Sequence, residues 1–120
     1  MITVTFALRS ESSDLIPLLR RGTSTEAGQH SILGELHGRE ICVLHTGVGE
    51  TTTRARVANF LRGQTPDLLI SSGFAGALHD QLRVGDLFVA QNYSAPHLAS
   101  IAQSLPGFPP APESAPPPLR

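Results

Sequence analysis

Two apolar runs of this chain each lead into a glycine-containing turn, and this pattern constrains the fold more than any other feature. The first run and its turn span residues 43–50, and the second pair spans residues 69–78. Glycine is needed where the backbone has a positive φ or comes close to another molecule. In open α/β sheets, ligands bind beyond the carboxyl ends of the strands. The pattern therefore predicts two strands whose following loops contact a small molecule.

The first half of the chain predicts a strand, a helix and a hairpin. Residues 2–7 alternate β-branched and aromatic residues, as in a strand, and residues 10–21 change to helical spacing. Pro17 delays the start of this helix because proline is tolerated only in a first turn. Residues 31–36 and 40–44 flank a short glycine-bearing connection, which predicts an antiparallel hairpin.

The second half continues the alternation of helices and strands. Residues 50–62 predict a helix that ends at Gly63, and the compact apolar run of residues 67–71 predicts a central strand. Residues 84–90 predict a further strand, and a short helix is expected from Pro96 to Gln103. The expected fold class is α/β, with a mixed, largely parallel sheet flanked by helices.

The composition predicts one domain with a tail. Residues 1–104 have the length and apolar content of a single domain, whereas residues 105–120 contain seven of the ten prolines and almost no apolar periodicity. Such a segment cannot bury enough surface to offset the entropy of ordering, so a disordered or polyproline-type tail is expected. Recruitment of a proline-binding partner is the alternative interpretation of this tail.

Charge and cysteine content exclude several classes of partner. The chain has nine arginines, no lysine, ten acidic residues and a formal net charge of -1, so it lacks the basic field that nucleic acid or an anionic membrane requires. Its amino terminus is too short and too threonine-rich for a signal peptide or a membrane span. The single cysteine, Cys42, cannot form an intrachain disulfide, which predicts a cytoplasmic protein. The five histidines show no metal-ligand spacing, so no metal is expected.

The first glycine turn has two interpretations. Residues 47–49 precede the predicted helix, whose free N–H groups and partial positive charge would bind a phosphate, a carboxylate or a ribose hydroxyl. The turn lacks the lysine of a phosphate-binding P-loop and the third glycine of a dinucleotide fingerprint. A tight strand-to-helix connection without a ligand is the alternative, and residues 71–76 have a similar alternative as a close-packed crossover.

Glu11 is the acid placed just beyond the first predicted strand. At that edge of the sheet its carboxylate would reach a bound ligand and could hold and deprotonate a water molecule. The alternative is an exposed acid in the first turn of a helix, where it complements the helix dipole. Neither a Ser/His/Asp set nor a cysteine nucleophile has supporting sequence context, which argues against covalent acyl chemistry.

Four segments together carry a family resemblance. They are residues 7–11 (Ala-Leu-Arg-Ser-Glu), 46–49 (Thr-Gly-Val-Gly), 66–78 (Pro-Asp-Leu-Leu-Ile-Ser-Ser-Gly-Phe-Ala-Gly-Ala-Leu) and 82–87 (Leu-Arg-Val-Gly-Asp-Leu). In their order and spacing they resemble the purine nucleoside phosphorylase and methylthioadenosine/adenosylhomocysteine nucleosidase superfamily. The resemblance covers residues 1 to about 95. It implies a nucleoside phosphorylase-like fold that needs no cofactor and cleaves the N-glycosidic bond of a purine-type nucleoside with water or phosphate.

The resemblance also implies roles for individual residues. Glu11 stands where the nucleosidases have the glutamate that activates water, and Val48 and Gly49 stand on the turn that contacts the sugar. The loop that lines the ribose and the base corresponds to three residues, Phe74, Ala75 and Gly76. Family members commonly have serine or threonine where this chain has Phe74, so the resemblance implies a more apolar pocket here.

The length of the chain departs from the resemblance. Family members carry, in their second half, an aspartate that protonates the leaving purine and a glutamate that grips the ribose, and nothing in this chain replaces them. General acid catalysis typically contributes ~10²–10⁴-fold to the rate. We therefore expect an incomplete, amino-terminal part of the fold with weak or no activity alone. The alternative is a noncatalytic remnant that binds nucleosides or forms a homodimer through exposed sheet edges.

Overall fold

The computed structural model of this protein describes residues 1–20, 30–90, 96–97, 100 and 104. The chain divides into two compact units, Met1–Ala75 and Gly76–Arg120. All the named strands and helices of the described residues lie in the first unit. The predicted boundary between residues 104 and 105 stays a prediction, because residues 105–120 lie outside the described residues.

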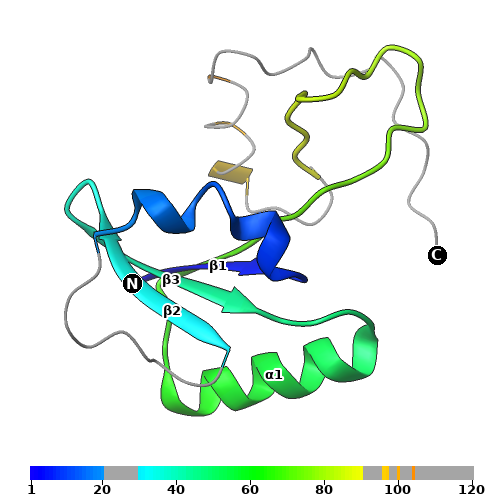
Figure 1. The fold of residues 1–120 in the computed structure, drawn as a ribbon. Helices are drawn as coiled ribbons and strands as arrows, with labels where there is room; N and C mark the ends of the chain where they lie inside the picture. The colour runs from blue at the N-terminus through cyan, green and yellow to red at the C-terminus, as the bar shows by residue number, and fades with distance from the viewer. Residues whose placement is uncertain (21–29, 91–95, 98–99, 101–103, 105–120) are drawn as a thin grey trace. The chain divides into compact units, whose positions relative to one another are not determined.

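A four-stranded sheet forms the centre of the first unit (Figure 1). The strands are β1 (Ile2–Phe6), β2 (Ser31–Leu36), β3 (Arg39–His45) and β4 (Leu68–Ser71), in the order β2-β3-β1-β4. β1 is parallel to both β3 and β4, and β2 is antiparallel to β3. The predicted α/β class with a mixed, largely parallel sheet is confirmed.

The predicted hairpin is also confirmed. β2 and β3 pair from Ser31 opposite Leu44 to Leu36 opposite Arg39, so that only His37 and Gly38 form the loop. Both loop residues have a positive φ, 50° at His37 and 76° at Gly38. Two consecutive positive φ angles characterise the tight turns whose twist matches that of antiparallel strands.

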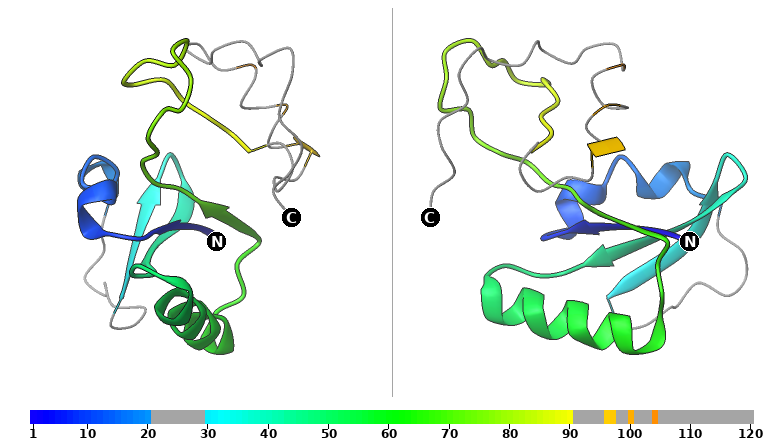
Figure 2. Two further views of the ribbon diagram at one scale, coloured as in Figure 1. Left: turned by 90° about the vertical axis from the view of Figure 1, so that its right-hand side faces the viewer. Right: turned by 180° about the vertical axis from the view of Figure 1, so that it is seen from behind.

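The core lies on both faces of β3, because successive side chains of a strand point to opposite faces. Ile41 and Val43 pack with Phe6 and Leu19 on the face covered by the segment after β1. Cys42 and Leu44 form a second cluster with Phe60 of α1 (Glu50–Gly63) on the opposite face. Figures 1 and 2 show these two coverings on either side of the sheet. The helix predicted over residues 50–62 is confirmed.

The α-helix predicted over residues 10–21 is wrong. The described part of this segment forms two 3-10 helices, η1 (Arg9–Ser12) and η2 (Ile16–Leu18). Pro17 cannot donate the backbone hydrogen bond that an α-helix interior requires. In addition, the Ser12 hydroxyl donates to the Arg9 carbonyl at 3.0 Å, and such local side-chain bonds compete with regular helix.

Two predictions about strands are also wrong. Within the described sheet β4 is an edge strand that pairs only with β1, while β1 and β3 are central. No strand forms over residues 84–90, because the first of them belong to a turn in which the Asp86 N–H donates to the Arg83 carbonyl at 3.1 Å and Gly85 has a φ of 96°. Val84, Leu87 and Phe88 are exposed, and the described residues of this second unit contain no strand to pair with them.

The helix predicted from Pro96 to Gln103 falls partly outside the described residues. Pro96, His97 and Ser100 have helical backbone, in agreement with the prediction. Residues 98–99 and 101–103 lie outside the described residues.

Gly34 of β2 offers a test of how the segment after β1 packs on the sheet. A Cβ added there would lie 2.8 Å from the Leu19 Cβ and 3.3 Å from the Arg20 carbonyl oxygen. Arg20 cannot move away easily, because its N–H and carbonyl both bond to Glu35 at 2.8 Å. We expect Gly34→Ala to lower the free energy of unfolding by about 1–3 kcal/mol, the usual cost of overpacking.

The measurement is urea unfolding followed by far-ultraviolet circular dichroism. Gly63→Ala is the matched control, since nothing lies within 4 Å of a Cβ at that position at the end of α1. This control should leave stability unchanged or slightly higher, because alanine restricts the unfolded chain. Equal stability of the two variants would contradict the described packing of Leu19 on β2.

Cys42 is expected to be unreactive in the folded protein. Its side chain is fully buried, and burial, helped by the charge of Glu40, raises the pKa of the Cys42 thiol to about 11. Only the thiolate reacts with alkylating reagents, and a rise of this size lowers the thiolate fraction at neutral pH by about 100-fold. Iodoacetamide labelling followed by mass spectrometry should be slow in buffer and complete in urea. Rapid labelling of the native protein would show that β3 is not covered on this face.

Candidate functional site

The loops that follow β1, β3 and β4 begin at the same edge of the sheet, because β1 is parallel to both neighbours. Backbone hydrogen bonds continue the pairing past the strand ends, from Thr46 N–H to the Phe6 carbonyl (2.8 Å), from Gly47 N–H to the Ala7 carbonyl (3.0 Å) and from Ser72 N–H to the Thr5 carbonyl (2.8 Å). These bonds hold the three loops side by side. The edge is the one at which open α/β sheets bind ligands.

Glu11 joins two of these loops. It is the third residue of η1, which directly follows β1, and its Oε2 accepts a hydrogen bond from the Leu8 N–H at 3.0 Å. Its Oε1 accepts a longer hydrogen bond from the Phe74 N–H, at 3.4 Å, in the loop after β4. A Cβ at Gly73 would lie 3.2 Å from the same Oε1, so this glycine lets the loop approach the carboxylate closely.

These contacts keep the carboxylate of Glu11 charged. The hydrogen bond from the Leu8 N–H is the largest effect on the pKa of Glu11 and lowers it, and the Phe74 N–H lowers it further; partial burial opposes both. A carboxylate that accepts backbone N–H bonds favours its ionised form. Glu11 is therefore ionised at neutral pH and able to accept a proton.

Glu11 can accept a further hydrogen bond. An ionised carboxylate offers about four lone-pair positions, and the backbone N–H groups of Leu8, Phe74 and Ala7 account for at most three of them. The bond from Leu8 is also the glutamate half of a capping box at the start of a short helix. The alternative expected for Glu11, an acid in the first turn of a helix, is therefore also observed, and this position does not prevent the same carboxylate from accepting a proton from water.

The loop between β3 and α1 contains the first glycine turn. Gly47 and Gly49 have φ angles of 77° and 88°, which residues with a side chain rarely adopt. The Thr53 hydroxyl donates to the Gly47 carbonyl at 3.3 Å and ties the turn to the first turn of α1. These glycines are required by a tight strand-to-helix connection, so their backbone angles are no evidence for a ligand.

The predicted site residues are brought together to different degrees. Glu11 and Phe74 are in hydrogen-bond contact, and Ala75 follows Phe74 in the same exposed loop. Val48 and Gly49 lie on the adjoining loop after β3, and both are exposed. Gly76 is the first residue of the second unit. The binding roles of these residues stay predictions.

Sequence reasoning missed the pair formed by Ser12 and His45. The Ser12 Oγ lies 2.8 Å from the His45 Nε2, and both residues are buried. The strand pattern contains the signal that could have found it. His45 has the same parity as Ile41 and Val43, so it points to the face of the sheet that the segment after β1 covers.

In the described part of the chain, the histidine, cysteine, aspartate and glutamate side chains include no group of three or more placed to hold a metal ion. None of its helices is both long enough and apolar enough to cross a bilayer.

Comparison with known proteins decides the family. The family model of the phosphorylase superfamily matches residues 6–119, nearly the whole chain and including every predicted site residue. The chain belongs to the phosphorylase superfamily. The resemblance noted in the four sequence segments is thereby confirmed.

Curated relatives of this superfamily member include several nucleosidases. The chain is 31% identical over 85 residues to a 5′-methylthioadenosine/S-adenosylhomocysteine nucleosidase of Shewanella piezotolerans, an alignment that covers 70% of this chain and 37% of the relative. The protein of the same name from Shewanella sp. (strain W3-18-1) is 32% identical over 85 residues, with the same coverage. The chain thus spans little more than a third of the length of the relatives it matches.

Proposed function

We propose that this phosphorylase-superfamily chain carries the nucleophile-activating part of a nucleosidase site, which cleaves the N-glycosidic bond of a purine-type nucleoside. The observation that carries the proposal is the charged Glu11 carboxylate, fixed by the Leu8 and Phe74 N–H groups at the edge of a parallel sheet. The names of the relatives support the reaction class, since they are nucleosidases.

In the proposed reaction, Glu11 accepts a proton from a bound water. The water oxygen forms a bond to the anomeric carbon of the ribose, and the carbon–nitrogen bond to the base breaks. The electron pair of that bond leaves with the base, which must take up a proton. A positioned carboxylate that removes the proton of the water contributes typically 10²–10⁴-fold, provided that it is ionised and within hydrogen-bond reach.

The other predicted residues would bind the substrate around Glu11. Val48 and Gly49 are proposed to contact the sugar, and the loop of Phe74, Ala75 and Gly76 to line the ribose and the base. The exposed ring of Phe74 supports this assignment, because it offers an apolar face on which a purine can stack. Phe74 also donates its N–H to Glu11, so the same loop would contact both the substrate and the general base Glu11.

Water is the favoured nucleophile over phosphate. A phosphate placed beside Glu11 would be repelled by the negative charge of the carboxylate. The Phe74 N–H, which could donate to an anion, already donates to Glu11, and the phenyl side chain of Phe74 supplies no hydroxyl. We therefore propose hydrolysis. We also propose a cytoplasmic location, because the free thiol of Cys42 stays reduced there.

We propose that these 120 residues alone turn over slowly. None of the predicted site residues is placed to protonate the leaving base, and losing such an acid typically costs ~10²–10⁴-fold in rate. The site is also open, since the side chains of Val48 and Phe74 are exposed. Closing a site from water strengthens the electrostatic interactions inside it, and an open site lacks that gain.

The test is release of free base, measured by liquid chromatography at high protein concentration. 5′-Methylthioadenosine and S-adenosylhomocysteine serve as substrates, and inosine with added phosphate tests phosphorolysis. We expect slow adenine release that does not depend on phosphate. Substrate binding by calorimetry without any release would instead favour a noncatalytic remnant, and formation of ribose 1-phosphate would favour a phosphorylase.

A further inference from the structure

The buried pair of Ser12 and His45 lies directly beside the residue proposed to activate water. Ser12 follows Glu11 in η1, and His45 is the last residue of β3. The Ser12 Oγ and the His45 Nε2 are 2.8 Å apart, and the two residues are 0% and 4% exposed. Buried polar groups of this kind are held by their hydrogen bonds, so the pair ties η1 to the end of β3.

The hydrogen bonds around Ser12 determine which atom carries each proton. The Ser12 hydroxyl also lies 3.0 Å from the Arg9 carbonyl oxygen, which can only accept. The single hydroxyl proton therefore goes to Arg9, and the Ser12 oxygen accepts from His45. This requires the imidazole to carry a proton on Nε2.

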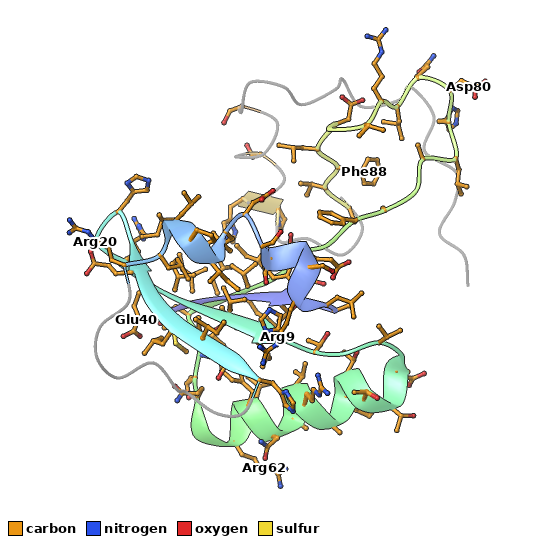
Figure 3. The ribbon with its side chains drawn as sticks, in the orientation of Figure 1. Arg9, Arg20, Glu40, Arg62, Asp80 and Phe88 are labelled. Carbon is orange, nitrogen blue, oxygen red and sulfur yellow. The ribbon has the colours of Figure 1, made fainter. Side chains whose placement is uncertain are left out.

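The surroundings of His45 favour a neutral ring. Burial is the largest effect and lowers the pKa of His45, and electrostatic interactions with Arg9, His30 and Arg56 lower it further. Figure 3 shows the labelled Arg9 close to the end of β3. A neutral imidazole with its proton on Nε2 is a directional donor, and it adds no charge beside the Glu11 carboxylate.

We infer that His45, acting through Ser12, is a positioning residue for Glu11. The chain from the His45 Nε2–H to the Ser12 Oγ and on to the Arg9 carbonyl fixes the two ends of the four-residue turn that contains Glu11. The carboxylate can then meet the Leu8 and Phe74 N–H groups together. This inference rests on the proposed function of Glu11, but titration and hydrogen-bond measurements test it without turnover.

The first experiment uses nuclear magnetic resonance of the full chain and requires no turnover. The side-chain ¹⁵N signals of His45 should show the neutral form protonated on Nε2. The carboxyl ¹³C signal of Glu11, assigned with Glu11→Gln, should titrate below the ordinary range of glutamate in the native protein. In Ser12→Ala and His45→Leu, which break the chain of hydrogen bonds, that pKa should rise toward the ordinary value.

His45→Gln is the conservative control, because the glutamine amide can place an N–H near the position of the imidazole Nε2–H. It should keep the low Glu11 pKa that His45→Leu loses. A merely structural histidine would lower the urea midpoint in these variants and leave the Glu11 titration of the folded protein unmoved. Should His45→Leu fail to fold, Ser12→Ala carries the decision, since it removes only one oxygen atom.

If the wild-type chain releases base, its kinetics provide a second readout. Ser12→Ala should lower kcat by about 10- to 100-fold with little change in KM, the effect of a misplaced catalytic group. An imidazole protonated on Nδ1, or a Glu11 pKa unchanged in folded Ser12→Ala, would overturn the inference. A wild-type chain that releases no base but shows the expected titrations would refute the proposed function and leave this inference standing.

Discussion

Glu11→Gln is expected to slow base release, with a loss of about 10²–10⁴-fold in kcat/KM. The amide of glutamine has nearly the shape of the carboxylate, and its oxygen can still accept the Leu8 N–H that Glu11 accepts. The fold of η1 should therefore survive, while the group that accepts the proton of water is lost. Chromatographic measurement of free base from 5′-methylthioadenosine tests this expectation.

Glu40→Gln is the matched control for this change. Glu40 lies near the start of β3, at the opposite end of the strand from the site, and is exposed. Its substitution should leave kcat/KM unchanged, and urea unfolding should give similar midpoints for both variants and the wild type. Wild-type rates in a folded Glu11→Gln protein would remove Glu11 from the mechanism.

The pH dependence of the wild-type rate follows from the same hydrogen bonds. Because the Leu8 and Phe74 N–H groups lower the pKa of Glu11, the carboxylate stays unprotonated as the pH falls through the ordinary range for glutamate. kcat/KM should hold through that range and decline only below it, as Glu11 takes up a proton. A decline that begins near neutral pH would indicate a different essential base.

Phe60→Ala is expected to cost about 3–5 kcal/mol of unfolding free energy, a large share of the stability of a small domain. Phe60 is 6% exposed and is the buried residue of α1, where it packs against Cys42 and Leu44 of β3. Its removal leaves a cavity between the helix and the sheet. Undocking of α1 would also release the glycine turn that Thr53 ties to the helix.

Leu61→Ala provides the comparison, because the neighbouring Leu61 is 47% exposed on the same helix. A change at this position should cost much less than the change at Phe60. Urea unfolding by circular dichroism gives both values, and the amide exchange of α1 shows whether the helix has loosened. Similar losses in the two variants would mean that Phe60 does not anchor α1 on β3.

The elements that could be predicted from the sequence are those in which local pattern and tertiary packing agree. The hairpin around Gly38 and the helix after Gly49 have both the required periodicity and the required turn residues. No α-helix forms over the described part of residues 10–21, because Pro17 and the hydrogen-bonding side chains before it outweigh the apolar spacing. Residues 84–90 have the composition of a strand, but they belong to the second unit, whose described residues include no strand to pair with them.

The part of the candidate site that follows from strand topology could be predicted from the sequence. Parallel strands bring their following loops to one edge, so the approach of Glu11 to the loop containing Phe74 could be expected. The partnership of Ser12 with His45 could not, because it depends on a side-chain contact across 33 residues of sequence separation. Only the alternation of side chains along β3 indicates which face of the sheet the His45 side chain points to.

The 3.4 Å contact between Phe74 and Glu11 couples the basicity of the carboxylate to the position of the loop. The Phe74 amide withdraws electron density from the oxygen that it contacts, so any movement of this amide away from Glu11 increases the affinity of the carboxylate for protons. The loop after β4 therefore affects both the protonation state of Glu11 and the orientation of its carboxylate.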